Sequence, residues 1–338
     1  MNIGQFTAFY PSRPFWAVKQ IDFNEPKSLD NFEELMSEEV FTESNEIFSM
    51  KICRDGMVML RIEALEKDDA TSSAANDIEV SVKKWGEYLN YLNSFYLLLD
   101  SGAIKTMNLA YFRLHEITNL DAFRVRYENG KSMGQNIALE SVTSVFQMGR
   151  FKSSYALPIP SDPKIFMRQV ISSEAITSAV EQFRLVVQTS GLEKVLASFT
   201  KSIAEYKVGN FDTAIVLAWF ISESIILKIW RDHLSDLNSD ADPGRQRINT
   251  DRLNFLTGRD FPISSISNIL ELFGSIPLDL FRDVDAVRRF RNKVVHSDSR
   301  YSATAANAQL AIKTALELAK REYGIDFGLN LSYSVSGL

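Results

Sequence analysis

Cysteine and histidine are scarce in this chain of 338 residues. Its single cysteine, Cys53, excludes an internal disulfide, and only three histidines accompany it, His115, His233 and His296. A cluster of cysteine and histidine at zinc-ligand spacing therefore cannot be formed. We expect no bound metal, and a reducing, cytoplasmic location follows as the default.

Glycine-rich phosphate-binding motifs are also absent. The sequence has no G-x-x-x-x-G-K-[ST] loop and no G-x-G-x-x-G fingerprint, so neither a nucleotide-binding loop nor a dinucleotide fold is predicted. It has no G-x-S-x-G elbow, which disfavours an α/β-hydrolase. His115-Glu116 begins like a zinc-protease motif, but no second histidine follows four residues later, and we interpret His115 as a strand residue. We predict no cofactor, although a metal-dependent hydrolase assembled from dispersed carboxylates stays an alternative.

Long uninterrupted hydrophobic runs are missing as well. The most apolar segment is 211–230, FDTAIVLAWFISESIILKIW, and three charged residues interrupt it, Asp212, Glu223 and Lys228. Its longest uninterrupted run, Ala214–Ile221, is far shorter than the ~20 residues of a membrane span. The amino-terminal residues lack the basic start and apolar run of a secretory signal. We therefore expect a soluble protein without a membrane partner, in which 211–230 forms a buried helix.

Positive charge is scarce overall and concentrated locally. The net charge of −6 argues against a protein coated in nucleic acid. Residues 1–80 hold 16 acidic and 7 basic side chains, which leaves a net charge of +3 for residues 81–338. Within these, the segment Phe281–Arg300 alone has six basic and three acidic side chains. This concentration favours one anionic site over a broad binding face.

Prolines mark a boundary between two domains, as the length of the chain suggests. Three of the nine prolines fall within the segment Leu157–Pro163, where they oppose both helix and strand. We predict an acidic α+β domain at 1–160 with a sensing, partner-binding or regulatory role, an all-α helical bundle at 161–326, and a tail at 327–338.

The predicted elements of the first domain are mixed. Asp55-Gly56 lies between two β-prone runs in 47–65, the strongest short-range signal of a hairpin. The apolar spacing of 78–99 predicts an amphipathic helix. We predict a strand pair in 107–127 around Asn119 and a strand at 142–148.

The second domain reads as helices joined by short connections. We predict helices at 173–188, 191–207, 211–235, 263–274, 281–297 and 302–322, and a loop at 236–250. The tail alternates enough for a short strand, although frayed ends are common.

The segment 281–296, FRDVDAVRRFRNKVVH, places a charged residue in an apolar face. At helical spacing one face collects Leu280, Val284, Val287, Phe290, Val294 and Val295, and Arg291 falls near its centre. A guanidinium there must reach solvent, meet a carboxylate or line a polar cleft. Glu223 in the apolar helix is the obvious partner for an ion pair with Arg291.

Asn292 and His296 lie one helical turn apart, with Arg288 and Arg289 beside them. This set suits RNA cleavage without a metal, because histidine moves a proton and arginine holds the phosphate and its transition-state charge. One such histidine per chain supplies one of the two proton transfers. A symmetric dimer that pairs two such helices supplies both.

The segment RNKVVH, Arg291–His296, in a helical domain resembles the R-N-x-x-x-H form of the R-x(4–6)-H motif of HEPN domains. The likeness covers about residues 165–325, and the apolar segment with Glu223 is similar to an apolar family helix with an acidic residue. It implies a helical bundle that dimerises through the motif helices. Many members are metal-independent ribonucleases of toxin–antitoxin, antiphage or stress systems, and some only bind nucleotides, RNA or proteins.

We therefore expect a cytoplasmic homodimeric ribonuclease that leaves a cyclic phosphate. His296 is its expected acid–base residue, Arg291 the organiser of the phosphate and cleft, and Asn292 a positioning donor, with Glu223, Arg288 and Arg289 in support. An antitoxin or defence complex is a possible partner. The alternative is a non-catalytic dimerisation and binding module, in which Arg291 only pairs with Glu223 and His296 caps its helix.

Overall fold

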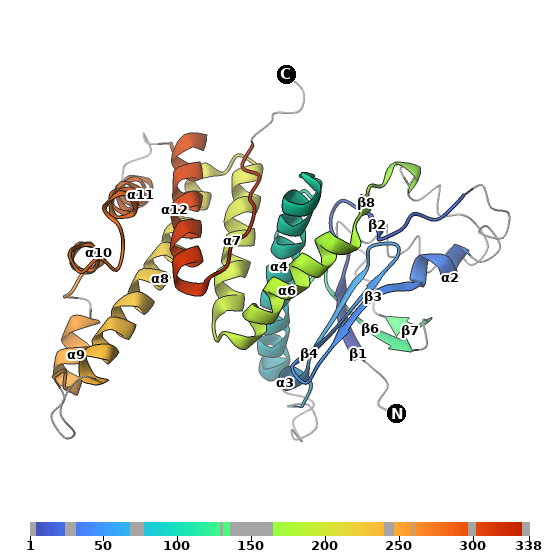
Figure 1. Ribbon diagram of the computed structural model, residues 1–338, viewed down its shortest axis with the longest axis horizontal. Coiled ribbons are helices and arrows are strands. Elements are labelled where there is room, and N and C mark those ends of the chain that lie inside the picture. Colours follow the sequence, from blue (N-terminus) through green and yellow to red (C-terminus); the bar gives the residue numbers. More distant parts are fainter. Residues whose placement is uncertain are drawn as a thin grey trace. The chain divides into compact units, whose positions relative to one another are not determined.

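The computed structural model describes residues 5–23, 32–67, 78–128, 131–135, 165–239, 247–258, 260–296 and 302–332. The chain divides into two compact units (Figure 1). The first unit comprises Met1–Thr200 with Phe327–Asn330, and the second comprises Lys201–Asp326 with Leu331–Leu338. The predicted order, an α+β part followed by a helical part, is confirmed.

A six-stranded antiparallel sheet forms the centre of the first unit. Its strand order is β3-β4-β5-β1-β6-β7, and the strands are β1 (Gln5–Phe9), β3 (Glu39–Ser44), β4 (Phe48–Cys53), β5 (Val58–Ile62), β6 (Phe123–Glu128) and β7 (Lys131–Gln135). A separate parallel pair joins β2 (Trp16–Ala17) to β8 (Val170–Ile171). Short helices α2 (Phe32–Ser37) and α3 (Glu63–Lys67) and a 3-10 turn, Ile165–Met167, also belong to the described part of this unit.

The predicted hairpin at Asp55-Gly56 is confirmed as β4 and β5. Gly56 has a φ of +86°, and a Cβ atom there would meet the ring of Phe15 at 2.9 Å, so the turn requires glycine. The Asp55 carboxylate accepts hydrogen bonds from the Met57 amide at 3.2 Å and the Tyr10 hydroxyl at 2.8 Å. The turn is thus tied to the residue that follows β1.

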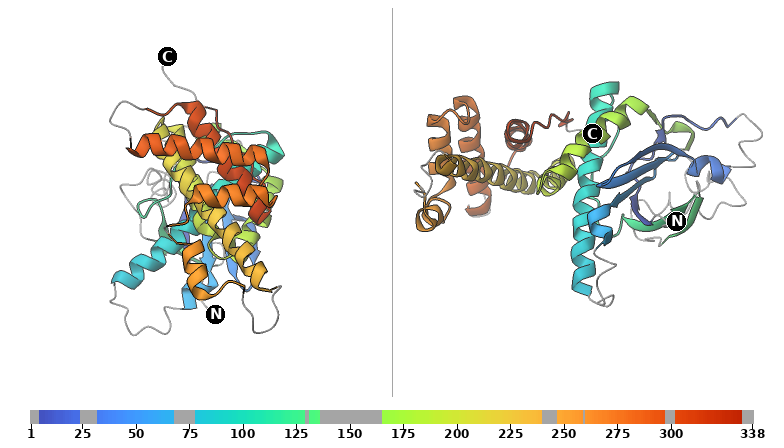
Figure 2. Two further views of the ribbon diagram at one scale, coloured as in Figure 1. Left: turned by 90° about the vertical axis from the view of Figure 1, so that its left-hand side faces the viewer. Right: turned by 60° about the horizontal axis from the view of Figure 1, so that its bottom comes forward.

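Two helices cover one face of the sheet. They are α4 (Ile78–Met107) and α6 (Ser173–Gln188), which pack against each other, and Figure 2 shows them together beside the sheet. Alternation along the strands directs Phe9 and Phe48 to this face. There Phe9 contacts Tyr96 of α4 at 5.7 Å between ring centroids, and Phe48 contacts Phe183 of α6 at 5.4 Å.

The opposite face of the sheet is also apolar. Its buried cluster comes from the alternate strand positions and contains Phe6, Ala8, Tyr10, Cys53, Met57, Met59, Phe123, Val125 and Tyr127. Burial at nearly every position is found in β1 and β5 at the centre of the sheet, whereas β4, FSMKIC, and β6, FRVRYE, largely alternate apolar with polar side chains.

The first-unit predictions succeed for local signals and fail for long-range ones. The helix expected at 78–99 is present and extends to Met107. The strand pair expected in 107–127 is wrong, because residues 108–122 form neither helix nor strand and β6 pairs with β1. Asn93 of α4 exchanges two 2.8 Å hydrogen bonds with the Ile117 backbone, which replace a strand ladder. The strand expected at 142–148 and the boundary at 157–163 lie outside the described residues.

The boundary between the compact units falls inside α7 (Leu192–Lys207), whereas the sequence places one near residue 160. Helix α6 belongs to the first unit because its buried side packs along α4. The segment Phe327–Asn330 also returns to the first unit, where the Phe327 ring lies 5.1 Å from that of Phe199 and the Gly328 amide donates to Ser101 Oγ at 2.8 Å. Residues 327–332, the described part of the expected tail, form no strand.

The second unit is a bundle of helices. Helix α8 (Phe211–Ser239) packs against α10 (Ile263–Leu272), α11 (Leu278–His296) and α12 (Ala305–Tyr323), and the short α9 (Thr250–Leu256) follows α8 in the chain. The predicted helices are confirmed with shifts of a few residues at their ends, and α8 extends into the expected loop. The Thr304 and Asn307 side chains form a capping box that fixes the start of α12.

Helix α8 is the one helix in the described part of the chain that is long and apolar enough to cross a membrane. Half of the residues in its most apolar window are buried inside the structure. The core helix of a soluble protein passes the same test of length and composition.

Candidate functional site

The residues of the predicted motif lie on α11, which the sequence defines well. Leu280, Val284 and Val287 recur at helical spacing and form its buried stripe. Asp279 lies in the first turn, and Lys293 and His296 lie in the last, as the helix dipole favours.

Arg291 continues the buried stripe one turn after Val287, as predicted. Its Nη1 donates a hydrogen bond to Asn292 Oδ1 at 3.1 Å, and its Nε is buried without a hydrogen-bond partner. The expected ion pair with Glu223 does not form between these two described residues. Glu223 is only half-buried on α8, so its carboxylate keeps access to water and does not depend on Arg291. Val295, expected on the apolar face, is 47% exposed because it lies in the last turn.

Asp285 clamps two arginines of the same helix. Its Oδ1 accepts hydrogen bonds from Arg288 Nε at 3.2 Å and Nη2 at 2.7 Å, and its Oδ2 pairs with Arg289. Hydrogen bonds from Arg288, with the charge of Arg289, hold the pKa of the Asp285 carboxyl below its usual range. The side chains are 24% exposed for Asp285, 31% for Arg288 and 70% for Arg289. Sequence reasoning found both arginines but missed the aspartate, which its i, i+3 and i+4 spacing could have revealed.

The structure divides the predicted residues between two sides of α11. At 3.6 residues per turn, Asp285, Asn292 and His296 fall within about 20° of one line, with Arg288 and Arg289 on either side. Arg291 is about 140° away from His296 around the helix axis. Asn292 is half-buried and His296 is exposed at the end of the helix. The helix therefore presents a histidine, an amide and two fixed guanidinium groups along one stripe.

The described residues contain no group of three or more histidine, cysteine or acidic side chains that could hold a metal ion. Apart from Asp285, the α11 stripe consists of two guanidinium groups with N–H donors, the amide of Asn292 and the imidazole of His296. Such a set suits an anion better than a metal.

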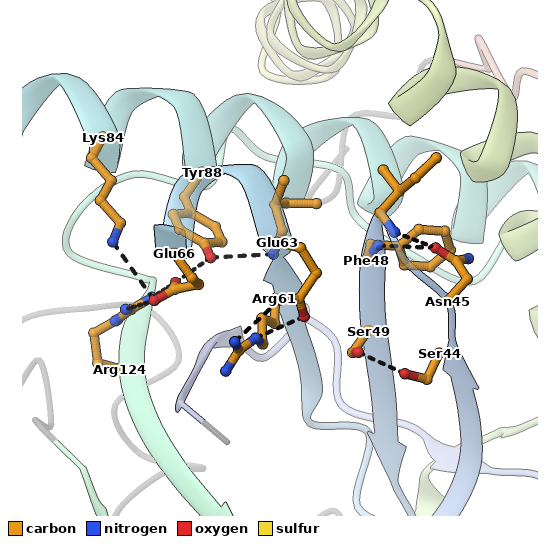
Figure 3. A network of polar contacts seen from close by, with 12 residues as sticks. Ser44, Asn45, Phe48, Ser49, Arg61, Glu63, Glu66, Lys84, Tyr88 and Arg124 are labelled. Atoms are coloured by element: carbon orange, nitrogen blue, oxygen red, sulfur yellow. Dashed lines mark hydrogen bonds and ion pairs between the residues drawn. The ribbon is translucent and has the colours of Figure 1, made fainter. Parts of the chain in front are cut away.

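The first unit holds a second polar cluster, which sequence reasoning missed (Figure 3). Glu66 of α3 accepts hydrogen bonds from Arg124 Nη1 at 2.9 Å and Nη2 at 3.0 Å, and from the Tyr88 hydroxyl. Lys84 Nζ lies 3.6 Å from Glu66 Oε2, and Arg124 also donates to Thr7 Oγ1 at 2.7 Å. The signal in the sequence is FRVRYE, 123–128, where charged side chains alternate with apolar ones.

Burial and hydrogen bonding shift the pKa values of this cluster. Burial raises the pKa of the Glu66 carboxyl, but hydrogen bonds from Arg124 and Tyr88 outweigh it and leave the pKa below its usual 4.5. Burial, and a hydrogen bond to Glu66, raise the pKa of the Tyr88 hydroxyl. These groups satisfy one another's hydrogen-bonding capacity, so we interpret the cluster as a structural polar network, the Glu66 network, that links α3, α4 and β6.

His115 is not a strand residue, which corrects the expectation from its flanks. It lies in the irregular segment 108–122, with its ring 5.6 Å from that of Tyr96 and its Nε2 3.9 Å from Asp121 Oδ1. Burial lowers the pKa of the imidazole, and the charge of Asp121 offsets this only in part.

No family model, curated protein or solved structure matches this chain.

Proposed function

We propose that the protein is a metal-independent endoribonuclease of the HEPN type, which cleaves RNA by attack of the 2′-hydroxyl and leaves a cyclic phosphate. In this proposal His296 is the acid–base residue, Asn292 is a positioning donor, and Arg291 organises the cleft. Glu223 forms no ion pair with Arg291 and has no role in this proposal. The proposed setting is the cytoplasm, in a toxin–antitoxin, antiphage or stress response.

The observation that carries the proposal is the composition of the α11 stripe. His296 is exposed, as proton transfer with a substrate requires, and it shares a helix side with Asn292 and with the Arg288–Arg289 pair. Guanidinium groups bind phosphate through several parallel hydrogen bonds. Cleavage through a cyclic phosphate requires a histidine that moves protons, and the Arg288–Arg289 pair on the same side of α11 adds cationic groups that attract the RNA backbone.

The proposal includes a homodimer formed through the second unit. A single His296 cannot act as both the base for the 2′-hydroxyl and the acid for the leaving oxygen at the same moment. A second copy of α11 supplies the other histidine. The buried Nε of Arg291 has no hydrogen-bond partner and lies on the other side of α11, so it is no part of this contact.

The alternative is a non-catalytic dimerisation and binding module. The observation in its favour is the exposure of large apolar side chains on the helices of the second unit, with Phe220 of α8 at 51% and Val295 of α11 at 47%. In this alternative His296 only interacts favourably with the carboxyl end of its helix.

The test is incubation of total RNA in EDTA with the wild-type protein and with His296→Ala, followed by analysis of the product ends. We expect cleavage with cyclic-phosphate ends by the wild type only. Because His296 is exposed, its replacement should leave the thermal melting temperature unchanged. Equal cleavage by the variant refutes the role of His296, and absence of cleavage by both favours the binding module.

A further inference from the structure

Two cations of α11 lie too far along the helix from His296 to act on the same phosphate. Arg288 and Arg289 precede His296 by eight and seven residues, or about 12 and 10 Å at 1.5 Å per residue. Helical side chains lean toward the amino terminus, and the bonds to Asp285 hold both guanidinium groups in that direction. A hydrogen bond to phosphate spans only about 3 Å.

The clamp leaves donors available on the exposed side of the helix. Arg288 uses Nε and Nη2 for Asp285, and Arg289 uses Nη2. Each guanidinium carries five N–H donors, so both retain N–H groups beyond those that Asp285 accepts. The three charges sum to +1, so the pair still attracts an anion.

We infer that Asp285, Arg288 and Arg289 form a subsite for a backbone phosphate that flanks the scissile one, with Asp285 as the positioning residue. This inference rests on the proposed function in that the ligand is RNA. The subsite holds the strand along the α11 stripe, while Asn292 and His296 act on the bond that is cleaved. It requires a substrate that continues beyond the cleaved linkage.

A substitution at Asp285 distinguishes a positioning role of this residue from simple attraction between the arginines and RNA. Asp285→Asn makes the protein more positive by one charge, so nonspecific attraction would bind RNA more tightly. A positioning role predicts the reverse, because the neutral amide no longer fixes both arginines and their free rotation must be lost on binding.

The probe is a fluorescent 2′-O-methyl oligoribonucleotide, which cannot supply the attacking hydroxyl. Fluorescence anisotropy in EDTA gives its Kd for the full-length wild type, for Asp285→Asn, for Asp285→Glu and for Arg288→Ala combined with Arg289→Ala. The matched control is Arg282→Ala, which removes one cation from the same helix; Arg282 pairs with Asp279, and their side chains are 66% and 94% exposed.

We expect Kd to rise about tenfold in the double arginine variant and at least about threefold in Asp285→Asn, with partial rescue in Asp285→Glu. The slope of log Kd against log salt should fall by about 0.7 for each phosphate that the variant no longer binds. With cleavable RNA, KM should rise while kcat changes little, because the subsite is remote from the cleaved bond. The slope and the division between KM and kcat are readouts that a merely structural Asp285 would not move.

Three results would overturn the inference: tighter binding by Asp285→Asn, a double variant indistinguishable from Arg282→Ala, or no binding of the probe by the wild type. Failure of the proposed function has a different signature. Binding that depends on Asp285 and both arginines, without cleavage of any RNA, refutes the ribonuclease and retains these three residues as a binding site for an RNA phosphate.

Discussion

The Glu66 network offers the sharpest test of what stabilises the first unit. Glu66→Ala removes the acceptor of two hydrogen bonds from Arg124 and one from Tyr88, while Glu66→Gln retains an oxygen of similar shape without the charge. Arg124 keeps its hydrogen bond to Thr7 in both variants. The two variants thus separate the effect of the missing acceptor from the effect of the missing charge.

The expected cost follows from the burial of the pair. Removal of one partner from a fully buried ion pair costs about 3–5 kcal/mol, and exposed pairs contribute about 0–1 kcal/mol. The Glu66 and Arg124 side chains are 9% and 21% exposed, which places them between these cases and closer to the buried one. We expect Glu66→Ala to lower the free energy of unfolding of the first unit by about 2–3 kcal/mol and Glu66→Gln by about 1–2 kcal/mol.

The effect should depend on pH in one direction. The pKa of Glu66 is below its usual 4.5 in the folded protein, so the unfolded chain binds a proton there first as the pH falls. Its contribution is therefore complete well above pH 4.5 and is lost on acidification through the folded pKa. The difference in stability between the wild type and Glu66→Gln should shrink from about pH 6 to about pH 3.

Amide hydrogen exchange in β1, β6 and α4 of the full-length protein measures the stability of this unit at its own amide groups. The control is Glu43→Gln, whose partner Arg184 has a 48% exposed side chain, and its cost should stay below about 1 kcal/mol. The Glu66 network does not stabilise the first unit as described if Glu66→Ala costs no more than this control, or if the stability difference between the wild type and Glu66→Gln grows on acidification.

Two further predictions concern the same unit. A Cβ atom at Gly102 of α4 would lie 2.4 Å from the Ala175 carbonyl oxygen of α6, so Gly102→Ala should lower the free energy of unfolding in urea by about 1–3 kcal/mol. The control is Gly86→Ala in the same helix, where no atom lies within 4 Å of the added Cβ, and this change should stabilise the protein by up to about 1 kcal/mol. Equal effects of the two substitutions would contradict the close approach of α4 and α6. Burial lowers the pKa of His115, so the stability that depends on its neutral imidazole is complete above the usual pKa of 6.5 and is lost as the pH falls below it. His115→Phe keeps an aromatic ring beside Tyr96 and cannot be protonated. In thermal melts this variant should therefore lose less stability than the wild type between about pH 7 and about pH 5.

Local signals in the sequence predicted many of the helices and turns, but the pairing of strands that are distant in the sequence was not predicted. The apolar spacing of α6 and the turn at Asp55-Gly56 are contained in a few consecutive residues, so both were predictable. Strand β1 pairs with β5 and β6, which are about 50 and 115 residues away, and no local pattern encodes such partners. The assignment of α6 to the first unit likewise depends on Gly102, whose missing side chain admits the α6 backbone.

The candidate site shows the same division. The position of Arg291 on the buried stripe and the exposure of His296 follow from helical spacing and were predictable. The partner of Arg291 was not, because Glu223 and Arg291 lie on different helices and their approach depends on packing. The nearer acceptor, Asn292, forms the contact instead. The clamp by Asp285 was within reach of the sequence, since all three residues lie within two turns of one helix.

The return of Phe327–Asn330 to the first unit has a consequence for synthesis on the ribosome. The Phe199 ring and Ser101 receive their contacts from residues that are translated only after the whole of 201–326. Domains generally fold in order as they emerge, but this one waits for a late segment to complete its packing. Until then the Phe199 ring lacks its contact with Phe327, and Ser101 lacks its hydrogen bond from Gly328. A stop codon before residue 327 would therefore weaken the part of the protein that was made first.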